Sequence, residues 1–493
     1  MLINKGDFRW LGSKGMTWSS ASLKSDFYFG HKAGMLISSL RPAVLAALIL
    51  LFLVPDSFAL ESELWTYTRF RYEKDDRGSQ NYLMMYNDLT VANIIKDRLE
   101  ARFSGWFNIA PDDGANKAVY YDYLRVSQAY LLFKIPEPDL RLSLGRQYLE
   151  KVDCFNIDGL HADLGAAGKQ EFFLFGGRPV SFYSSTDDEY IFGGGMIFRP
   201  WWQTSLQLDA YALKENDINY EAAAIRMNQY LPLNTRAYGR LRLLQDGVRD
   251  VYATLSSFFD ESGVSSNISY FVQPQTRGTG KDALSRDFSQ YGQIFNASYA
   301  FQQAGLQLQK YTGDKWIING GAMIKRLLQD PGIYAWSNVD SNVFKAGLTR
   351  LDLFIAGLDV TVLGNYVDNK NDQFFDVTGE IDYKITKELS ASVGMTYTGY
   401  QFAYVEYPDT LNGQSAVYNL ADHIGSKIYF IDLSYSPTRS QKIALAGSYE
   451  AIDQRYSDAI VLQISYQHRF DLAEMGQRVK NIWNTRFMNG PTN

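Results

Sequence analysis

Apolar and polar residues alternate along most of the chain after residue 60. Within 375–384, Phe, Val, Gly, Ile and Tyr occupy every other position, with Asp, Thr, Glu, Asp and Lys between them. A turn-like Ile-Thr-Lys-Glu segment follows at 385–388, and the alternation resumes at 389–398. A period of two residues is typical of a β-strand with one apolar and one polar face. The pattern therefore predicts β-hairpins.

The same alternation recurs throughout the chain. Further strands are expected at about 64–72, 98–109, 203–213, 249–259, 358–366, 427–435, 442–450 and 458–470. Short turns are expected near 96–97, 135–139, 356–357, 385–388 and 436–441, and longer loops near 73–81, 110–121, 277–288 and 400–426. The segment 312–343 can be interpreted as a large loop, folded inward as a constriction or outward, or as an added hairpin.

Three environments could cover the apolar strand faces: a sandwich core, a solenoid core or lipid. A sandwich closes its core within about 100 residues, whereas the hairpin pattern here continues from residue 60 to residue 470 without a linker. A solenoid requires a repeat of fixed period, and the sequence has none. Strands of about 9–11 residues, with short turns at one end and long loops at the other, are typical of membrane barrels. We therefore predict an all-β fold, a transmembrane antiparallel up-and-down β-barrel with an even number of strands, about 18–22.

One apolar block differs from the strands. Residues 42–54, PAVLAALILLFLV, form a run of 13 residues that is too short for a transmembrane helix. Arg41 precedes the run and Ser57-Phe58-Ala59 follows it, which is the arrangement of a secretory signal peptide cleaved after Ala59. Because a signal peptide begins a chain, we expect residues 35–59 to be that peptide and residues 1–34 to be a misassigned upstream extension.

The expected barrel therefore spans residues 60–470, and residues 471–493 form a periplasmic tail. An apolar stripe of Leu472, Met475, Val479 and Ile482 would suit a helix in this tail. Export through the periplasm predicts that the barrel resides in the outer membrane of the cell.

Composition agrees with a membrane barrel. Aromatic residues make up 15% of the chain, and rings gather where strand ends meet lipid headgroups. The rings expected at strand ends are Tyr72, Tyr82, Trp106, Tyr383, Tyr397, Tyr400 and Phe470.

The formal net charge of −6 gives no basic excess for binding nucleic acid. Cys154 is the only cysteine, so neither an intrachain disulfide nor a cysteine metal cage can form.

The stretch AYLLFKIPEPDLRLSLGRQY at 129–148 resembles a hairpin of Gram-negative outer-membrane porin-like barrels. In that family an Ala-Tyr strand, a short periplasmic turn and a Leu-Gly-Arg-Gln strand follow one another. The resemblance is one of architecture and selects no subfamily. It implies a channel in outer-membrane lipid, without catalysis or cofactor. Such barrels often end on an aromatic residue, whereas here 23 residues follow Phe470.

If the apolar residues face lipid, their polar neighbours face the lumen of the barrel. This sorting predicts a lumen basic wall of Arg69, Arg71, Arg102, Arg125, Arg141, Arg236, Arg240 and Arg242. It also predicts a lumen acidic wall of Asp352, Asp359, Asp376, Glu380, Asp382 and Asp432. Facing walls of opposite charge would select solutes by charge and dipole. Alternatively, the same residues pair across strands and support the wall.

Other chemistry finds little support in the sequence. His161, His423 and His468 have no nucleophile-elbow or metal-binding motif around them. No CxxCH motif occurs, so the chain does not attach c-type haem itself. The glycine runs at 175–178 and 192–196 lack the context of a phosphate loop, and in strands such glycines mark kinks or close backbone contact.

The sequence thus favours a porin-like channel for passive or weakly selective passage of small hydrophilic solutes, with no metal and no enzyme activity. The alternative is a structural sheath in a porin–cytochrome electron conduit, whose partner would be a periplasmic or multihaem cytochrome. A barrel hydrolase that uses one of the histidines is a third hypothesis. The partners expected in the first case are outer-membrane lipid and the solutes themselves.

Overall fold

The computed structural model describes most of the chain after residue 60. The described ranges are 61–75, 78–109, 124–153, 155–165, 168–180, 189–201, 203–215, 218–245, 247–275, 300–313, 315–329, 339–369, 372–402, 405–408, 415–418, 423–452 and 458–471. The expected signal peptide, the extension before it, the tail after residue 471 and Cys154 lie outside the described residues.

Twenty-two strands form one antiparallel sheet. They are β1 (Glu61–Asp75), β2 (Gly78–Ile95), β3 (Leu99–Ile109), β4 (Leu124–Ile135), β5 (Leu140–Leu149), β6 (Phe155–Leu164), β7 (Gln170–Pro179), β8 (Tyr190–Phe198), β9 (Thr204–Glu215), β10 (Ile218–Leu231), β11 (Thr235–Leu244), β12 (Gly247–Phe259), β13 (Val264–Gln273), β14 (Phe301–Thr312), β15 (Trp316–Leu327), β16 (Ser341–Arg350), β17 (Leu358–Asn369), β18 (Asp372–Lys384), β19 (Leu389–Phe402), β22 (His423–Thr438), β23 (Gln441–Ile452) and β24 (Ala459–Asp471). A separate hairpin consists of β20 (Val405–Pro408) and β21 (Ser415–Tyr418). A 3-10 turn, η1 (Asp260–Ser262), links β12 and β13.

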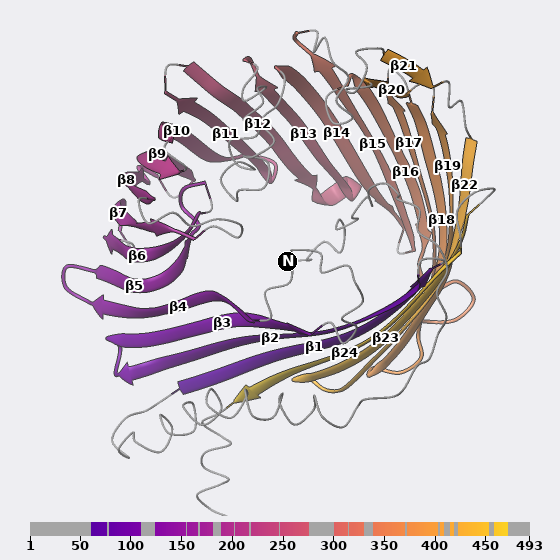
Figure 1. Cartoon of the computed structure of the whole chain (residues 1–493), viewed down its shortest axis with the longest axis horizontal. Coiled ribbons are helices and arrows are strands. Elements are labelled where there is room, and N and C mark those ends of the chain that lie inside the picture. Colours follow the sequence, from indigo (N-terminus) through magenta and orange to yellow (C-terminus); the bar gives the residue numbers. More distant parts are fainter. Residues whose placement is uncertain are drawn as a thin grey trace, which may run out of the picture. The chain divides into compact units, whose positions relative to one another are not determined.

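The sheet closes into a ring. Each strand pairs with the next along the chain, β19 pairs with β22, and β1 pairs with β24 to complete the cylinder seen in Figure 1. At this seam, Arg469 donates a 2.6 Å hydrogen bond to Glu63. Closure is what a membrane requires, because hydrocarbon cannot hydrogen-bond a free strand edge. The prediction of a closed up-and-down barrel with an even strand number is confirmed.

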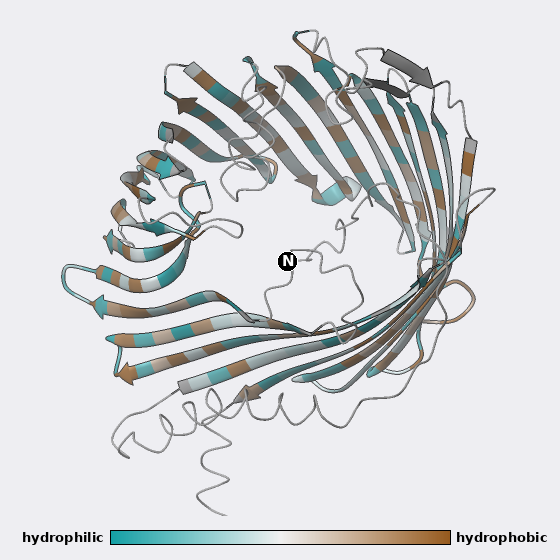
Figure 2. Ribbon diagram, viewed as in Figure 1, coloured by the Kyte–Doolittle hydropathy of each residue, from teal (hydrophilic) through white to brown (hydrophobic). Residues whose placement is uncertain are grey.

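The outer face of the ring is apolar. On β24, Ile460, Leu462 and Ile464 are 39–49% exposed, and they alternate with Val461, Gln463 and Ser465 on the other face. Figure 2 shows this banding of hydrophobic and hydrophilic positions along many strands. An apolar exterior around a closed ring suits immersion in lipid. In the part of the chain with assigned structure, no helix is long and apolar enough to cross a membrane.

Connections at one end of the barrel are short, as predicted. They include 96–98, 136–139, 385–388 and 439–440. At the other end, the prediction of a long loop near 73–81 is wrong. The strand β1 continues to Asp75 and β2 begins at Gly78, so the two strands are joined by a short connection.

The segment 312–343 is not a large loop. Its residues 316–327 form β15, which pairs with β14 and β16 as a strand of the ring. Ile318 and Ile324 face outward, 47% and 43% exposed. The adjacent Gly320 and Gly321 interrupt the apolar alternation, which is why the sequence pattern left this strand ambiguous. The interpretation as an added hairpin is therefore closer to the structure than a constriction loop at these residues.

The predicted aromatic positions divide between the two faces of the wall. Tyr72, Tyr383, Tyr397 and Phe470 share the outward face with neighbours such as Leu462 and Ile381. Tyr82, Trp106 and Tyr400 lie on the lumen face, so for these three the prediction of contact with headgroups is wrong. The ring of Trp106 lies 5.4 Å from the Arg125 guanidinium carbon, and a cation–π contact of this kind can stabilise a ring inside a polar lumen.

Candidate functional site

The strands β5–β7 carry a row of glycines across the wall. Gly145, Gly159 and Gly177 occupy successive register positions. A Cβ atom on Gly159 would lie 2.6 Å from the Cα of Gly177 and closer still to the Gly176 oxygen. Only glycine permits so close an approach of two backbones. This agrees with the expectation that glycines here mark close backbone contact.

The turn between β5 and β6, Glu150–Asp153, folds into the lumen, and we call it the inner turn. Lys151 pairs with Asp163 and, at 2.5 Å, with Glu171. Along a straight β6, Asp163 would be roughly 26 Å from the start of the strand at Phe155. Because Lys151 nevertheless reaches Asp163, the hairpin must bend back over the inner face. The row of glycines lies where this bend is needed.

The outward face of the hairpin changes polarity at the glycine row. On the side of the row nearer the short turns, Leu144, Leu160 and Leu174 are exposed apolar residues. On the side of the row nearer the inner turn, and on the same outward face, Arg146 forms two hydrogen bonds of 2.7 and 2.8 Å with Asp158. An unshielded arginine facing lipid costs about 2–4 kcal/mol at the membrane midplane. The change in polarity is therefore what a sheet requires if it leaves the lipid at this row.

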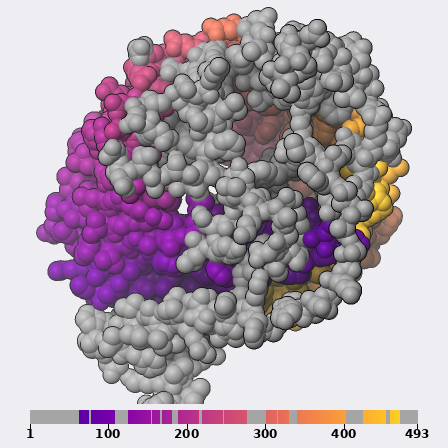
Figure 3. Space-filling model, in the orientation of Figure 1, coloured from indigo at the N-terminus to yellow at the C-terminus, as the bar shows by residue number. Residues whose placement is uncertain are grey.

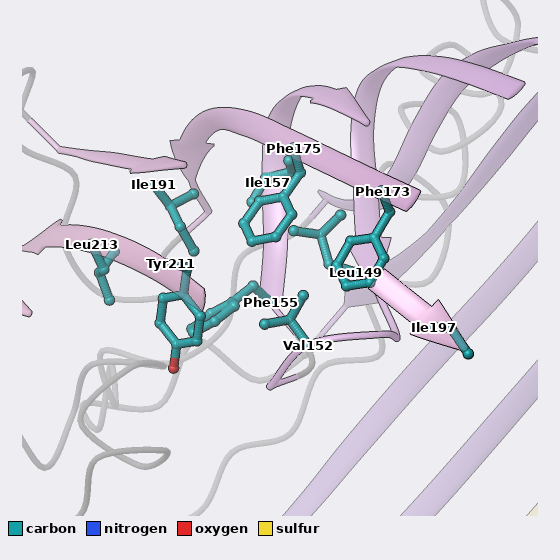
Figure 4. Close-up of a cluster of buried hydrophobic side chains, with 10 residues drawn as sticks. All are labelled: Leu149, Val152, Phe155, Ile157, Phe173, Phe175, Ile191, Ile197, Tyr211 and Leu213. Carbon is teal, nitrogen blue, oxygen red and sulfur yellow. The ribbon is translucent and has the colours of Figure 1, made fainter. Parts of the chain in front are cut away.

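A buried apolar cluster anchors the inner turn (Figure 4). It contains Leu149, Val152, Phe155, Ile157, Phe173, Phe175, Ile191, Ile197, Tyr211 and Leu213. Burying a large apolar side chain stabilises by about 1.5–3 kcal/mol, so the cluster can hold the turn in the lumen. In Figure 3 the side chains of the neighbouring strands form a continuous wall on this side. Between β5 and β9 the lumen side of the wall therefore carries an apolar cluster as well as charged side chains.

Asp153, the last described residue of the inner turn, lies among arginines from β10, β11 and β12. Its Oδ1 accepts hydrogen bonds from Arg242 at 2.9 Å and from Arg226 at 3.3 Å, and its Oδ2 accepts one of 2.7 Å from the Tyr211 hydroxyl. The Arg249 guanidinium lies 4.0 Å away. Burial acts to raise the pKa of Asp153, but the charges of Arg242 and Arg249 and the hydrogen bonds from Tyr211 and Arg242 outweigh it, so the pKa lies below its usual value.

Two further carboxylates complete this group, which we call the arginine cluster. Asp209 pairs with Arg226, and Asp250 pairs with Arg242 at 2.6 Å and Arg240 at 3.3 Å. A β-bulge shifts the register between β11 and β12 after Arg242. It allows both Arg249 and Asp250 to be buried, with 8% and 1% exposure. Four guanidinium groups thus meet three carboxylates, which leaves one net positive charge.

All eight arginines predicted for the basic wall lie at lumen-facing register positions: Arg69, Arg71, Arg102, Arg125, Arg141, Arg236, Arg240 and Arg242. Several of them pair with carboxylates. Arg102 lies 3.0 Å from Asp88, and Arg71 lies 3.0 Å from Glu73. Cross-strand support of the wall, the alternative interpretation, therefore accounts for part of this set.

Five of the six predicted acidic residues occupy lumen-facing strand positions: Asp359, Asp376, Glu380, Asp382 and Asp432. Neutral groups bind two of them, since Asn365 donates to Asp376 and Ser392 donates to Glu380, both at 2.7 Å. Asp352 differs, because it lies in the turn before β17 and accepts a 2.7 Å hydrogen bond from the backbone N–H of Gly357. Figure 1 places β17 and β18 across the ring from β4 and β5.

Sequence reasoning missed the centre of the site. Asp153, Arg226 and Arg249 were not expected to meet, because their proximity requires both the inward bend and the bulge. The glycine runs were the available signal for the bend. His161 lies 3.2 Å from Asp163, and no group of three or more potential metal ligands occurs among residues that the structure describes.

A closed ring of 22 strands, an apolar exterior and a lumen face carrying charged and amide side chains define a β-barrel of the transmembrane type. No protein-family model and no curated protein matches the chain.

Several solved structures are similar to it. Pseudomonas aeruginosa OpdK, solved with vanillate, is 11% identical, with a TM-score of 0.42 and coverage of 84% of this chain and 100% of that one. The translocation pore of the P pilus usher PapC is 11% identical, with a TM-score of 0.46 and coverage of 83% and 99%. Pseudomonas aeruginosa OccK2, solved with glucuronate, is 9% identical, with a TM-score of 0.41 and coverage of 84% and 98%. Likenesses at this level do not extend to function, and the fold assignment rests on the strand pairing of the chain itself.

Proposed function

We propose that the protein is an outer-membrane channel for passive, weakly selective passage of small hydrophilic solutes. The observation that carries this proposal is the closed strand ring whose polar positions face inward. Such a ring replaces a hydrocarbon barrier with a path that can hydrogen-bond and solvate a polar solute. Transport needs no chemical step, so neither a catalytic group nor a cofactor is required.

The inner turn would narrow this path from one side. Solutes would pass the arginine cluster and the inner turn on that side and the acidic wall on another. Most cluster charges are paired, which weakens their field, and the carboxylates of Asp376 and Glu380 have neutral partners. A weak transverse field of this kind favours mild discrimination by charge and dipole. Export through the periplasm, with residues 35–59 as signal peptide, belongs to the same proposal.

The alternative of a sheath around a multihaem cytochrome receives no support from the comparisons. Val152 and Lys151 of the inner turn occupy part of the lumen that a threaded partner would share.

Planar-bilayer recording of the purified protein tests the proposal. We expect stepwise ion conductance by the protein alone, and a salt gradient should reveal a modest preference between anions and cations. Replacing both Arg69 and Arg71 with glutamate should shift the reversal potential toward cations with little loss of folding. The control replaces Lys387 and Arg439, which lie in turns, and changes the same total charge. Absence of conductance would overturn the channel, and equal shifts in both double variants would remove the basic wall from the selectivity.

A further inference from the structure

The inner faces of β11–β17 enclose a hollow of about 660 Å³. Amide side chains dominate its lining, and we call them the amide shelf: Asn267, Gln307, Gln309, Asn319 and Asn365. Ser256 and Ser265 add hydroxyl groups to the lining. Arg236 of the basic wall and Lys345 also line the hollow, but no residue of the arginine cluster does.

Register explains why the wall is hollow here. One row of paired positions runs from Asn267 through Gln307, Gly321 and Lys345 to Asn365. The neighbouring row runs through Gln309, Asn319 and Gly347. Gly321 and Gly347 occupy lumen-facing positions and provide no side chain. Gly321 therefore leaves a gap beside the amide groups, whereas the Leu363 side chain covers Gly347, where an added Cβ would lie 2.5 Å from it.

The shelf retains free hydrogen-bonding capacity. Within the described part of the chain, Gln307 and Asn319 have no hydrogen-bond partner for their side chains. Asn267, which also lines the hollow, donates to Thr254 and Ser256 at 3.1 and 2.7 Å. An amide both donates and accepts, as a hydroxyl does. A row of amides is therefore matched to a solute that carries many hydroxyl groups.

Apolar rings border the shelf toward the short-turn end of the barrel. Phe258 lines the hollow and is 42% exposed. Tyr311 faces the lumen beside Gln309, whose amide donates a 3.0 Å hydrogen bond to the Tyr311 hydroxyl. Rings of this kind offer a flat apolar surface beside polar groups. A sugar ring has the complementary character, with polar hydroxyls at its rim and apolar C–H faces.

We propose that the amide shelf is a binding site for neutral, hydroxyl-rich solutes, namely small saccharides, on their way through the channel. This inference rests on the proposed function and names a solute class for it. The size of the hollow falls in the range of small-molecule sites, about 300–1,000 Å³. Arg236 and Lys345 also line the hollow, but most of its polar contacts are uncharged amides and hydroxyls. Such contacts keep binding weak, which conduction requires, because a solute must leave the site as readily as it enters.

Single-channel recording with maltose as the probe tests the site. We expect maltose to interrupt the ion current in a concentration-dependent manner. Replacing Gln307 and Asn319 with alanine should weaken maltose binding roughly tenfold, because two hydrogen bonds to the sugar are lost. The matched control is Gln303→Ala, which removes the same side chain from the same face of β14 outside the shelf and should leave binding unchanged.

A second pair of variants tests the site by filling the hollow, with a control on the opposite face of the same strand. Leucine at Gly321 would project into the shelf and abolish the interruptions by maltose. Leucine at Gly320 lies on the opposite face of the same strand, where an added Cβ meets open space, and should have no effect. Equal behaviour of the two variants would overturn the proposed site.

Failure of this inference can be told from failure of the channel. Ion conductance without interruption by maltose would overturn the shelf and leave the channel intact. If the protein conducts no ions, calorimetric titration of the detergent-solubilised protein with maltose still decides whether the shelf binds sugar. Tighter binding of gluconate than of maltose, lost in Lys345→Ala, would assign the site to anions and overturn the neutral class.

Discussion

Asp153 accepts a hydrogen bond of 2.9 Å from Nη1 of Arg242, a residue 89 positions further along the chain. This contact joins the turn between β5 and β6 to the wall formed by β11. Because Arg226 and Tyr211 bind the same carboxylate, one side chain holds the inner turn against three strands. The width of the path should therefore depend on Asp153.

Replacing Asp153 with alanine should release the inner turn. Removing one partner of a buried ion pair costs on the order of 3–5 kcal/mol, because the remaining charges lose their compensation. We expect larger single-channel conductance and more frequent current fluctuations. The exposed Glu150 in the same turn supplies the control, and Glu150→Ala should conduct as the natural protein does. A conductance for Asp153→Ala equal to that of the control would show that the carboxylate does not hold the turn.

The same contact predicts a response to acid. The pKa of Asp153 is lowered in the folded protein, so its ionised form contributes stability above the usual carboxyl pKa, about 3.9. This contribution is lost as the pH falls through the lowered folded value. Conductance should thus remain constant on acidification to about pH 5 and rise only below about pH 4. In Asp153→Asn the conductance should be high throughout, and a step of equal size in that variant would assign the response to other carboxylates.

The glycine row should be intolerant of side chains. Valine at Gly159 would place its Cβ within 3 Å of the β7 backbone, so the hairpin must shift or splay, at roughly 1–3 kcal/mol. We expect a lower temperature for loss of the folded band in heat-modifiability gels. At Gly239 on β11 an added Cβ meets no atom within 4 Å, and Gly239→Val should leave that temperature nearly unchanged.

Two adjacent residues of β24 distinguish the lipid face from the lumen face. Ile464 faces outward at 48% exposure, and an arginine there should destabilise the barrel by about 2–4 kcal/mol. The neighbouring Ser465 faces the lumen, so Ser465→Arg should cost far less. Urea titration of the protein folded into lipid vesicles measures both values. Similar losses in the two variants would mean that the assignment of faces is wrong.

Local alternation was sufficient to predict the fold. Ile381 beside Asp382 shows why, because an apolar and a charged side chain on successive residues cannot share one environment, and a strand separates them onto two faces. The parity of such pairs also placed the strand residues of both predicted walls on one face. Where glycine replaced the alternating side chain, as at Gly320 and Gly321, the signal vanished and the strand was ambiguous.

The contacts of the inner turn with the arginine cluster could not be predicted from local alternation. The contact of Asp153 with Arg249 depends on a bend in β5–β7, on a bulge in β12 and on closure of the whole ring. None of these is encoded by hydrophobic periodicity. Trp106 and Tyr400 illustrate a second limit, since an aromatic residue near a strand end satisfies the pattern on either face, and only register assigns the side.

Pairing between β1 and β24 sets a condition on biogenesis. A polypeptide that stops before residue 459 would possess every strand of the ring except β24, which pairs with both β23 and β1. Its outermost strands would each present a row of unsatisfied amides, which are templates for aggregation. The ring therefore cannot close until residues 459–471 have been synthesised, and until then the earlier strands retain two unprotected edges.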